Sequence, residues 1–305
     1  MAYEFVKDRT GVSGTTLRDI ACAMSPDGTT VYVAERPAGS SLGQIISMDW
    51  PNLDNETVVY SDPAGYTLTG VACTPSGPKA VMASHVDGSA EVRKFDETVI
   101  WTSPEGAPST TAGGAVWNPV LGRLFVMFDG STTNATLFSM LEDGSNVQSE
   151  LSSGIFVSDR PRLSVTPDGA VWWMQTTTST NNNSGSPQRW TNADGLDFGS
   201  SQNPQGLGVV VTPGSDTDVL TSFGSPFDTH RYGWNGSTVV LDAVTPPDTF
   251  DGYRIVHGAT DASFRRGVAY GIEPDDLTGA TVEDYRWWRF QTGRRFWVGS
   301  TGFSR

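Results

Sequence analysis

A strand, turn and strand unit recurs along this chain, and the repeat constrains the fold more than any single motif does. The first copy, LRDIACAMSPDGTTVYVAE, covers residues 17–35, and the second, LTGVACTPSGPKAVMASH, covers 68–85. Later copies cover 113–128, 162–175, 206–222 and, in degenerate form, 253–272. The prolines in the turns lie 49, 44, 48 and 46 residues apart, at Pro26, Pro75, Pro119, Pro167 and Pro213. The Pro-Asp-Gly sequence is therefore interpreted as a hairpin turn and not as a reactive site.

Each copy is followed by a third segment, such as GQIISMDW or AEVRKFD, and most copies by a fourth, such as ETVVYSD or TVIWTS. Four short antiparallel strands in roughly every 40 to 50 residues are typical of a β-propeller blade. The inner segments AVWWM and GVVV are apolar without alternation, as expected for strands that a neighbouring blade covers on each face. The sequence thus predicts an all-β, six-bladed β-propeller of four-stranded antiparallel blades.

We expect the whole chain, residues 1–305, to form this single propeller. The predicted blades cover 14–62, 63–107, 108–154, 155–202, 203–250 and 251–305. The segment YEFVK, within 1–13, is predicted to add an outer strand that closes the ring. Residues 294–300 compete for that place, because they resemble the fourth strand of the last blade.

The segments SPDGTTVYVAE and TPDGAVWWM resemble the turn of broad propeller superfamilies, which include YVTN, NHL, TolB-like and SMP-30-like proteins. The resemblance covers most of the chain at the level of the blade pattern. It implies the propeller fold, but the shared motif is a turn that carries no chemistry, so it implies no activity.

Composition and charge exclude several partners. The formal net charge of -14 opposes binding to DNA or RNA, because affinity for phosphate backbones needs clustered Lys and Arg. No run of apolar residues is long enough for a membrane-spanning helix, so we expect no membrane insertion. Cys22 and Cys73 are too few for a four-ligand zinc site and are predicted to be buried strand residues. The N-terminal sequence has no secretory signal, which predicts synthesis in a cytoplasm.

The long loops are predicted to gather on one face, formed by the loops between second and third strands and the connections between blades. Since loops on a rigid scaffold often carry function, we expect a ligand to bind there. The loops cover 36–43, 85–90, 129–135, 176–186, 223–229 and 273–284. The predicted binding residues are Arg36, His85, Asp87, Asp129, Asn181, Asn182, Asn183, Asp228, Glu273, Asp275 and Asp276.

No cofactor is predicted from these loops. Oxygens of Asp and Asn side chains from several loops can hold calcium, which takes about six to eight oxygen ligands. No contiguous calcium motif is present, so the loop acids, with Glu35 among them, are expected to form a solvated rim. His85, His230 and His257 fall in different blades and are expected to be structural rather than zinc ligands.

The sequence predicts no catalytic residue. SMP-30-like lactonases hold a divalent metal in the channel with Glu, Asn and Asp; here the inner strand ends carry Asp19, Arg160, Arg162 and His257, which do not reproduce that set. No G-x-S-x-G elbow, phosphate-binding loop or dinucleotide fingerprint is present. The aromatic and Arg-rich stretch YRWWRFQTGRRFWVG is interpreted as inter-blade packing, with a binding edge as the alternative.

The leading functional hypothesis is a non-catalytic virion protein, a phage tail-associated or decorating propeller. The surface is rich in Ser, Thr, Asn and Gly, as in proteins that work outside cells, and assembly into a particle reaches the exterior without a secretory signal. The expected partners are other virion proteins, or a glycan or protein of the host surface, within an oligomeric assembly. One alternative is a metal-dependent hydrolase or lactonase, and another is a cytoplasmic scaffold that binds peptides in an apolar groove.

Overall fold

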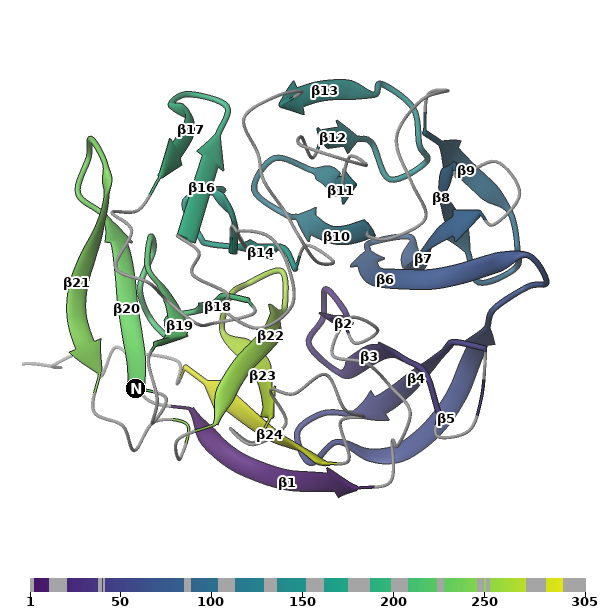
Figure 1. Cartoon of the computed structure of the whole chain (residues 1–305), viewed down its shortest axis with the longest axis horizontal. Helices are drawn as coiled ribbons and strands as arrows, with labels where there is room; N and C mark the ends of the chain where they lie inside the picture. Colours follow the sequence, from purple (N-terminus) through teal and green to yellow (C-terminus); the bar gives the residue numbers. More distant parts are fainter. Residues whose placement is uncertain are drawn as a thin grey trace, which may run out of the picture.

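Six four-stranded antiparallel sheets make up the fold in the computed structural model. Figure 1 shows these sheets arranged as blades around a central axis, which confirms the predicted six-bladed β-propeller. The described residues are 3–10, 21–37, 40, 42–84, 89–103, 113–128, 136–151, 162–174, 187–198, 208–223, 228–245, 250, 253–272 and 284–292. None of them forms a helix of the length and apolarity needed to cross a membrane.

The first three blades follow one another along the chain, each with its first strand nearest the axis (Figure 1). The first blade consists of β2 (Ala21–Met24), β3 (Thr30–Glu35), β4 (Gln44–Asp49) and β5 (Asp54–Ser61). The second consists of β6 (Tyr66–Thr74), β7 (Gly77–Ser84), β8 (Ala90–Lys94) and β9 (Val99–Thr102). The third consists of β10 (Gly113–Asn118), β11 (Arg123–Phe128), β12 (Thr136–Met140) and β13 (Gln148–Leu151).

The remaining blades complete the ring, and the last one also takes a strand from the N-terminus. The fourth consists of β14 (Ser164–Val165), β15 (Val171–Met174), β16 (Pro187–Thr191) and β17 (Gly195–Phe198). The fifth consists of β18 (Val210–Val211), β19 (Val219–Phe223), β20 (Asp228–Trp234) and β21 (Val239–Thr245). The sixth consists of β22 (Arg254–Thr260), β23 (Arg266–Ile272), β24 (Asp284–Gln291) and β1 (Glu4–Thr10).

The hydrophobic core is divided among the seams between blades. Each of the six clusters of buried side chains in the described structure joins two adjacent blades. Consecutive residues of β15 illustrate the reason, because Trp172 packs toward the fifth blade and Trp173 toward the third, and both are fully buried. A strand with a neighbour on each face has no polar side to present, which explains the continuous apolar run AVWWM.

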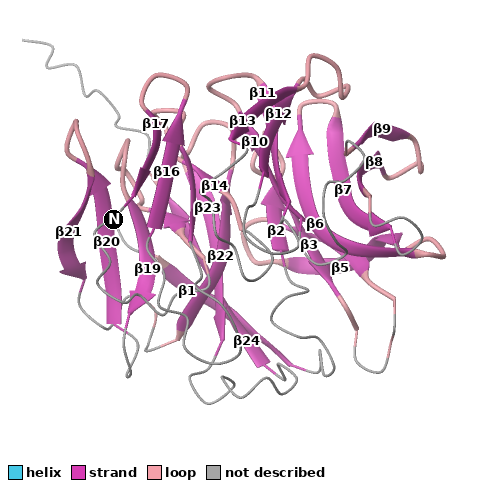
Figure 2. Ribbon diagram, turned by 45° about the horizontal axis from the view of Figure 1, so that its top comes forward, coloured by secondary structure: helices cyan, strands magenta, loops and turns pink. Residues whose placement is uncertain are grey.

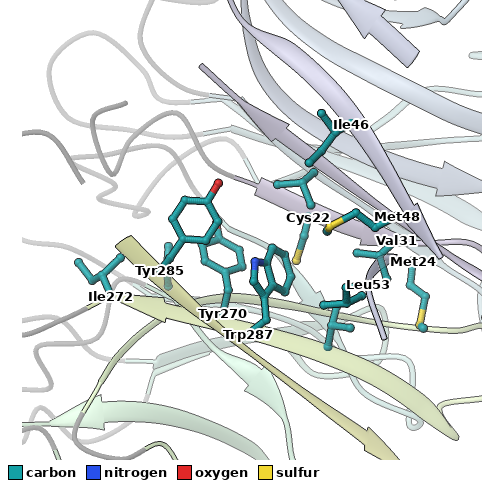
Figure 3. Packing of buried hydrophobic residues seen from close by; sticks show 13 residues of the cluster. Cys22, Met24, Val31, Ile46, Met48, Leu53, Tyr270, Ile272, Tyr285 and Trp287 are labelled. Atoms are coloured by element: carbon teal, nitrogen blue, oxygen red, sulfur yellow. The ribbon is translucent and has the colours of Figure 1, made fainter. Parts of the chain in front are cut away.

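The seam between the sixth and first blades is rich in aromatic side chains. Figure 3 shows Tyr270, Tyr285 and Trp287 of the sixth blade facing Cys22 and Met48 of the first. The next residues of β24 point to the other side, where Trp288 and Phe290 pack toward the fifth blade. The first half of the C-terminal aromatic stretch therefore packs between blades, as the sequence indicated, and its remainder lies outside the described residues.

The sixth blade is closed by the N-terminal strand. β1 pairs antiparallel with β24, from Glu4 opposite Arg289 to Thr10 opposite Asp284. Residues from the two ends of the sequence thus share one sheet, which closes the ring by main-chain hydrogen bonds. The competing segment 294–300 lies outside the described residues.

A buried ion pair reinforces this closure. The Arg9 guanidinium of β1 forms a salt bridge with Glu35, whose side chain is only 2% exposed. Arg9 also donates to the Tyr285 hydroxyl at 2.6 Å, and Gln44 donates to Glu35 at 3.0 Å. Glu35 was expected in a solvated rim of loop acids, and that expectation is wrong: it is the last residue of β3 and its carboxylate joins the first and sixth blades.

We expect Glu35→Ala to lower the free energy of unfolding by about 3 kcal/mol, because it leaves the partly buried Arg9 without its main counter-charge. Glu56→Ala is the matched control, since Glu56 also pairs with Arg9 but its side chain is 36% exposed. That change should cost less than about 1 kcal/mol. Urea denaturation of the two variants measures the difference, and equal losses would contradict a closure that depends on Glu35.

The turn between β2 and β3 shows why the Ser-Pro-Asp-Gly sequence of the first repeat has glycine in its last position. Gly28 has a φ of +68°, in the left-handed region that favours glycine. A Cβ at this position would lie 2.9 Å from Cδ of Arg266 and 3.1 Å from Cβ of Asp261, both in the sixth blade. Glycine therefore lets the chain turn and also lets the first and sixth blades approach each other.

Gly28→Ala should destabilise the protein more than Gly122→Ala does. Gly122 occupies the corresponding turn of the third blade with a φ of +63°, but a Cβ there would meet no atom within 4 Å. Both changes cost about 1 to 2 kcal/mol in backbone strain, and Gly28→Ala should add about 1 kcal/mol or more from the collision. Thermal and urea unfolding measure this difference; a larger loss for Gly122→Ala would show that the close approach is unimportant.

Candidate functional site

Two of the predicted binding residues fall within the described structure. Arg36 directly follows β3 and is half-buried, and Asp228 is the first residue of β20. The others lie outside the described residues: His85, Asp87, Asp129, Asn181, Asn182, Asn183, Glu273, Asp275 and Asp276. The proposed site on the long-loop face therefore stays a prediction. Asp19 and Arg160 also lie outside the described part of the chain.

His257 of β22 connects three blades near the axis. Its Nδ1 accepts a hydrogen bond from the main-chain N–H of Cys22 at 3.1 Å, in the first blade. Its Nε2 lies 3.0 Å from the carbonyl oxygen of Leu163, at the start of the fourth blade. Because Nδ1 is an acceptor, we assign the ring proton to Nε2, which donates it to Leu163. The sequence indicated a structural role for this histidine, and these bonds supply one.

Burial keeps His257 and Cys22 uncharged. Desolvation lowers the pKa of His257 to about 4. The hydrogen bond to Leu163 raises this pKa, whereas the nearby positive charge of Arg162 lowers it further. Desolvation raises the pKa of the Cys22 thiol well above its usual value. The thiol sulfur lies 3.7 Å from Nδ1 of His257, yet a neutral thiol beside a neutral imidazole is not an activated nucleophile. The sequence alone did not reveal this pairing, because the two residues are 235 positions apart.

The buried histidine should make stability depend on pH. Its pKa is about 4 when folded against 6.5 as the reference value, so below pH 6.5 the unfolded chain binds a proton that the folded chain does not. Stability should therefore fall as the pH drops from 6.5 towards 4, by about 3 kcal/mol from this residue.

His257→Gln tests this dependence, because glutamine offers an acceptor and a donor but does not titrate. Urea midpoints measured at several pH values should show a shallower loss for the variant between pH 6.5 and 4 than for the unaltered protein. His230→Gln serves as a histidine control on β20. Parallel curves for the unaltered protein and His257→Gln would contradict a depressed pKa.

An apolar hollow lies at one end of the axis, called here the axial hollow. It is lined by inner strands of all six blades and is small, with a cavity volume of about 40 Å³. Small side chains such as Ala72, Cys73 and Ala115 form much of its wall, and Trp117 and Pro119 stand on the side of the third blade. The hollow lies at the end of the strands that carries the turns between first and second strands, which we call the turn face.

The sequence had favoured the other end of the strands as the functional face. Figure 2 shows the strands running between two faces, with short turns such as that between β16 and β17 at the upper end. The hollow forms because inner strands from all six blades bring small residues together at the axis. The sequence pattern of a single blade does not show this. The signal in the sequence was the run of Ala, Cys and Gly at equivalent inner positions, including the matched Cys22 and Cys73.

A second, polar depression adjoins the hollow on the turn face, and we call it the seam cleft. It lies between the sixth and first blades, has a volume of about 350 Å³, and shares Pro26 and Asp261 with the axial hollow. Its polar lining includes Asp27, Asp261, Arg265, Arg266, Gln291 and Thr292. Carboxylates, guanidinium groups, an amide and a hydroxyl can all bind a polar ligand there.

Within the described ranges, no three His, Cys, Asp or Glu side chains come together as metal ligands. Arg162, which was expected near the axis, is buried and hydrogen-bonds with Tyr270 there. Cys22 and Cys73 are both buried and not joined in a disulfide, as the sequence indicated.

No family model matches this chain, and no curated protein sequence matches it. Among solved structures, it is similar to a gluconolactonase from Xanthomonas campestris, with 13% identity, coverage of 95% of this chain and 98% of that chain, and a TM-score of 0.54. It is also similar to a chain of a nidogen/laminin complex, with 15% identity, 78% and 82% coverage and a TM-score of 0.52. The likeness confirms the β-propeller fold.

A third similar structure is the lectin SapL1 in complex with α-methyl fucoside. It shares 15% identity over 75% of this chain and 81% of that chain, with a TM-score of 0.50. The three structures include an enzyme, a protein complex and a lectin, and identities this low establish the propeller fold alone.

Proposed function

We propose that this propeller is a non-catalytic binding protein, a structural or adhesion component of a virion that attaches to a host surface or to a neighbouring virion subunit. The observation that carries the proposal is that the polar side chains His257 and Cys22 near the axis hold blades together and are not free for chemistry. Both ring nitrogens of His257 are engaged in bonds between blades, and the adjacent Cys22 thiol is held neutral. A rigid ring of this kind presents a fixed surface for recognition. Neither His257 nor Cys22 can then act as an acid, base or nucleophile.

The turn face supplies a surface suited to binding. Trp117 is half-buried at the axial hollow, and aromatic side chains are frequent anchors in interfaces and in saccharide sites. Nearby turn residues leave apolar groups in solvent, with Val120 at 50% and Leu121 at 39% exposure. Binding of a protein by one similar structure and of a fucoside by another is compatible with this role.

The virion assignment rests on a composition rich in Ser, Thr, Asn and Gly, as in proteins that work outside cells. The chain has few charged residues, 18%, and a formal net charge of -14, which disfavours nucleic acid as a partner.

Purified phage particles from a culture that expresses this chain should contain its peptides by mass spectrometry. Particles that lack the chain would remove the virion role and leave only the binding role.

Trp117→Leu should reduce attachment of the labelled protein to host cells about tenfold or more, because it removes the aromatic surface at the hollow. Trp101→Leu is the matched control: both side chains are partly buried against the same hydrophobic cluster, but Trp101 stacks on Phe128 and does not line the hollow. Equal attachment of the two variants, with equal thermal stability, would contradict recognition through the turn face.

A further inference from the structure

The seam cleft has walls fixed by bonds between the first and sixth blades. Ala262 donates its main-chain N–H to the carbonyl oxygen of Pro26 at 3.1 Å. Arg266 donates through Nη1 to the carbonyl oxygens of Asp27 and Gly28, at 3.1 Å each. The two turns are thus joined directly, so a ligand would meet a preformed surface rather than one that must be ordered on binding.

Arg265 supplies an exposed cationic donor in the cleft. Its main chain is held at both ends, because its N–H donates to Asp261 at 2.9 Å and its carbonyl accepts from the N–H of Thr292 at 2.7 Å. Its side chain is exposed, and the guanidinium makes no ion pair with any other residue that the structure describes. A guanidinium in this state can donate two parallel hydrogen bonds to a carboxylate.

The two carboxylates of the cleft differ in how many of their oxygens already accept hydrogen bonds from the protein. Asp261 accepts from main-chain N–H groups through Oδ1 and from Ser263 through Oδ2. Asp27 accepts from Ser25 and Thr29 through Oδ1 alone, and these bonds keep its pKa below the usual value. Asp27 is therefore a carboxylate at neutral pH, and its Oδ2 can accept a hydrogen bond from a ligand hydroxyl.

The balance of charges narrows the ligand class. Two arginines and two aspartates line the cleft, so a compact anion such as inorganic phosphate would gain from Arg265 but be repelled by Asp27. A densely charged polymer would also meet the protein's net charge of -14. A ligand with one carboxylate and several hydroxyls satisfies both kinds of group, with the Gln291 amide as a further partner.

We propose that the seam cleft binds an acidic saccharide, whose carboxylate pairs with Arg265 and whose hydroxyls donate to Asp27. The ligand class rests on the proposed binding role of the turn face, and it identifies the host partner as a glycan that contains uronic acid or a similar sugar acid. The cleft meets the axial hollow at Pro26 and Asp261, but the hollow is too small to take a sugar ring, so the saccharide is expected to lie in the cleft.

Saturation-transfer NMR with glucuronate and with glucose as probes tests the proposal on the full chain. Glucuronate should bind at least tenfold more tightly than glucose, because only the acid pairs with Arg265. Arg265→Gln should remove that preference. Arg289→Gln is the control, since it removes the same charge from β24 at a residue that does not line the cleft and donates to Pro51 and Asn52 instead, and it should bind glucuronate as the unaltered protein does.

Three results would overturn the proposal: equal binding of glucose and glucuronate, equal losses in Arg265→Gln and Arg289→Gln, or tighter binding of inorganic phosphate or glucose 6-phosphate than of glucuronate. The last would identify the cleft as a phosphate site. A failure here leaves the attachment difference between Trp117→Leu and Trp101→Leu unchanged, so the cleft and the broader binding role can fail separately.

Discussion

The burial of every blade between two neighbours is the constraint on which the rest of the structure depends. A four-stranded sheet with large apolar groups on both faces, such as Trp172 and Trp173 on β15, has no stable existence alone in water. Only a closed ring covers both faces of all six sheets. The last seam must therefore form between residues from opposite ends of the sequence, and β1 supplies the outer strand there while Arg9 and Glu35 join the two blades across it.

Closure also decides the chemistry of the axis. As the blades converge, small side chains are needed on the inner strands, and polar groups that reach the axis must find partners among them. His257 does so by bonding to the first and fourth blades at once. The desolvation that accompanies such bonds lowers the pKa of His257 and raises that of the Cys22 thiol, so the histidine and thiol that contribute to the ring are unsuited to acid-base chemistry.

The regular part of the fold could be predicted because it repeats. The spacing of the turn prolines and the continuous apolar runs reflect local geometry. The same pattern occurs in each of the six blades, which strengthens the prediction. Residues whose roles depend on the closed ring could not be assigned this way. Glu35 resembled a loop acid because its partner Arg9 comes from β1, and the pairing of Cys22 with His257 spans 235 positions. The seam cleft likewise combines Asp27 of the first blade with Arg265 of the sixth. These residues are far apart in the sequence, and the repeat does not show which residues of adjacent blades lie side by side.

These observations favour recognition on the faces of the ring rather than in its channel. The axial groups His257 and Cys22 are committed to contacts between blades. The turns that join first and second strands also contact neighbouring blades, but some of their side chains point away from the seams. In the turn of the sixth blade, Asp261 fixes the main chain of Arg265, and the guanidinium remains outside the core. The seam where the ends of the chain meet is also the one that brings charged residues of two blades together in a single cleft.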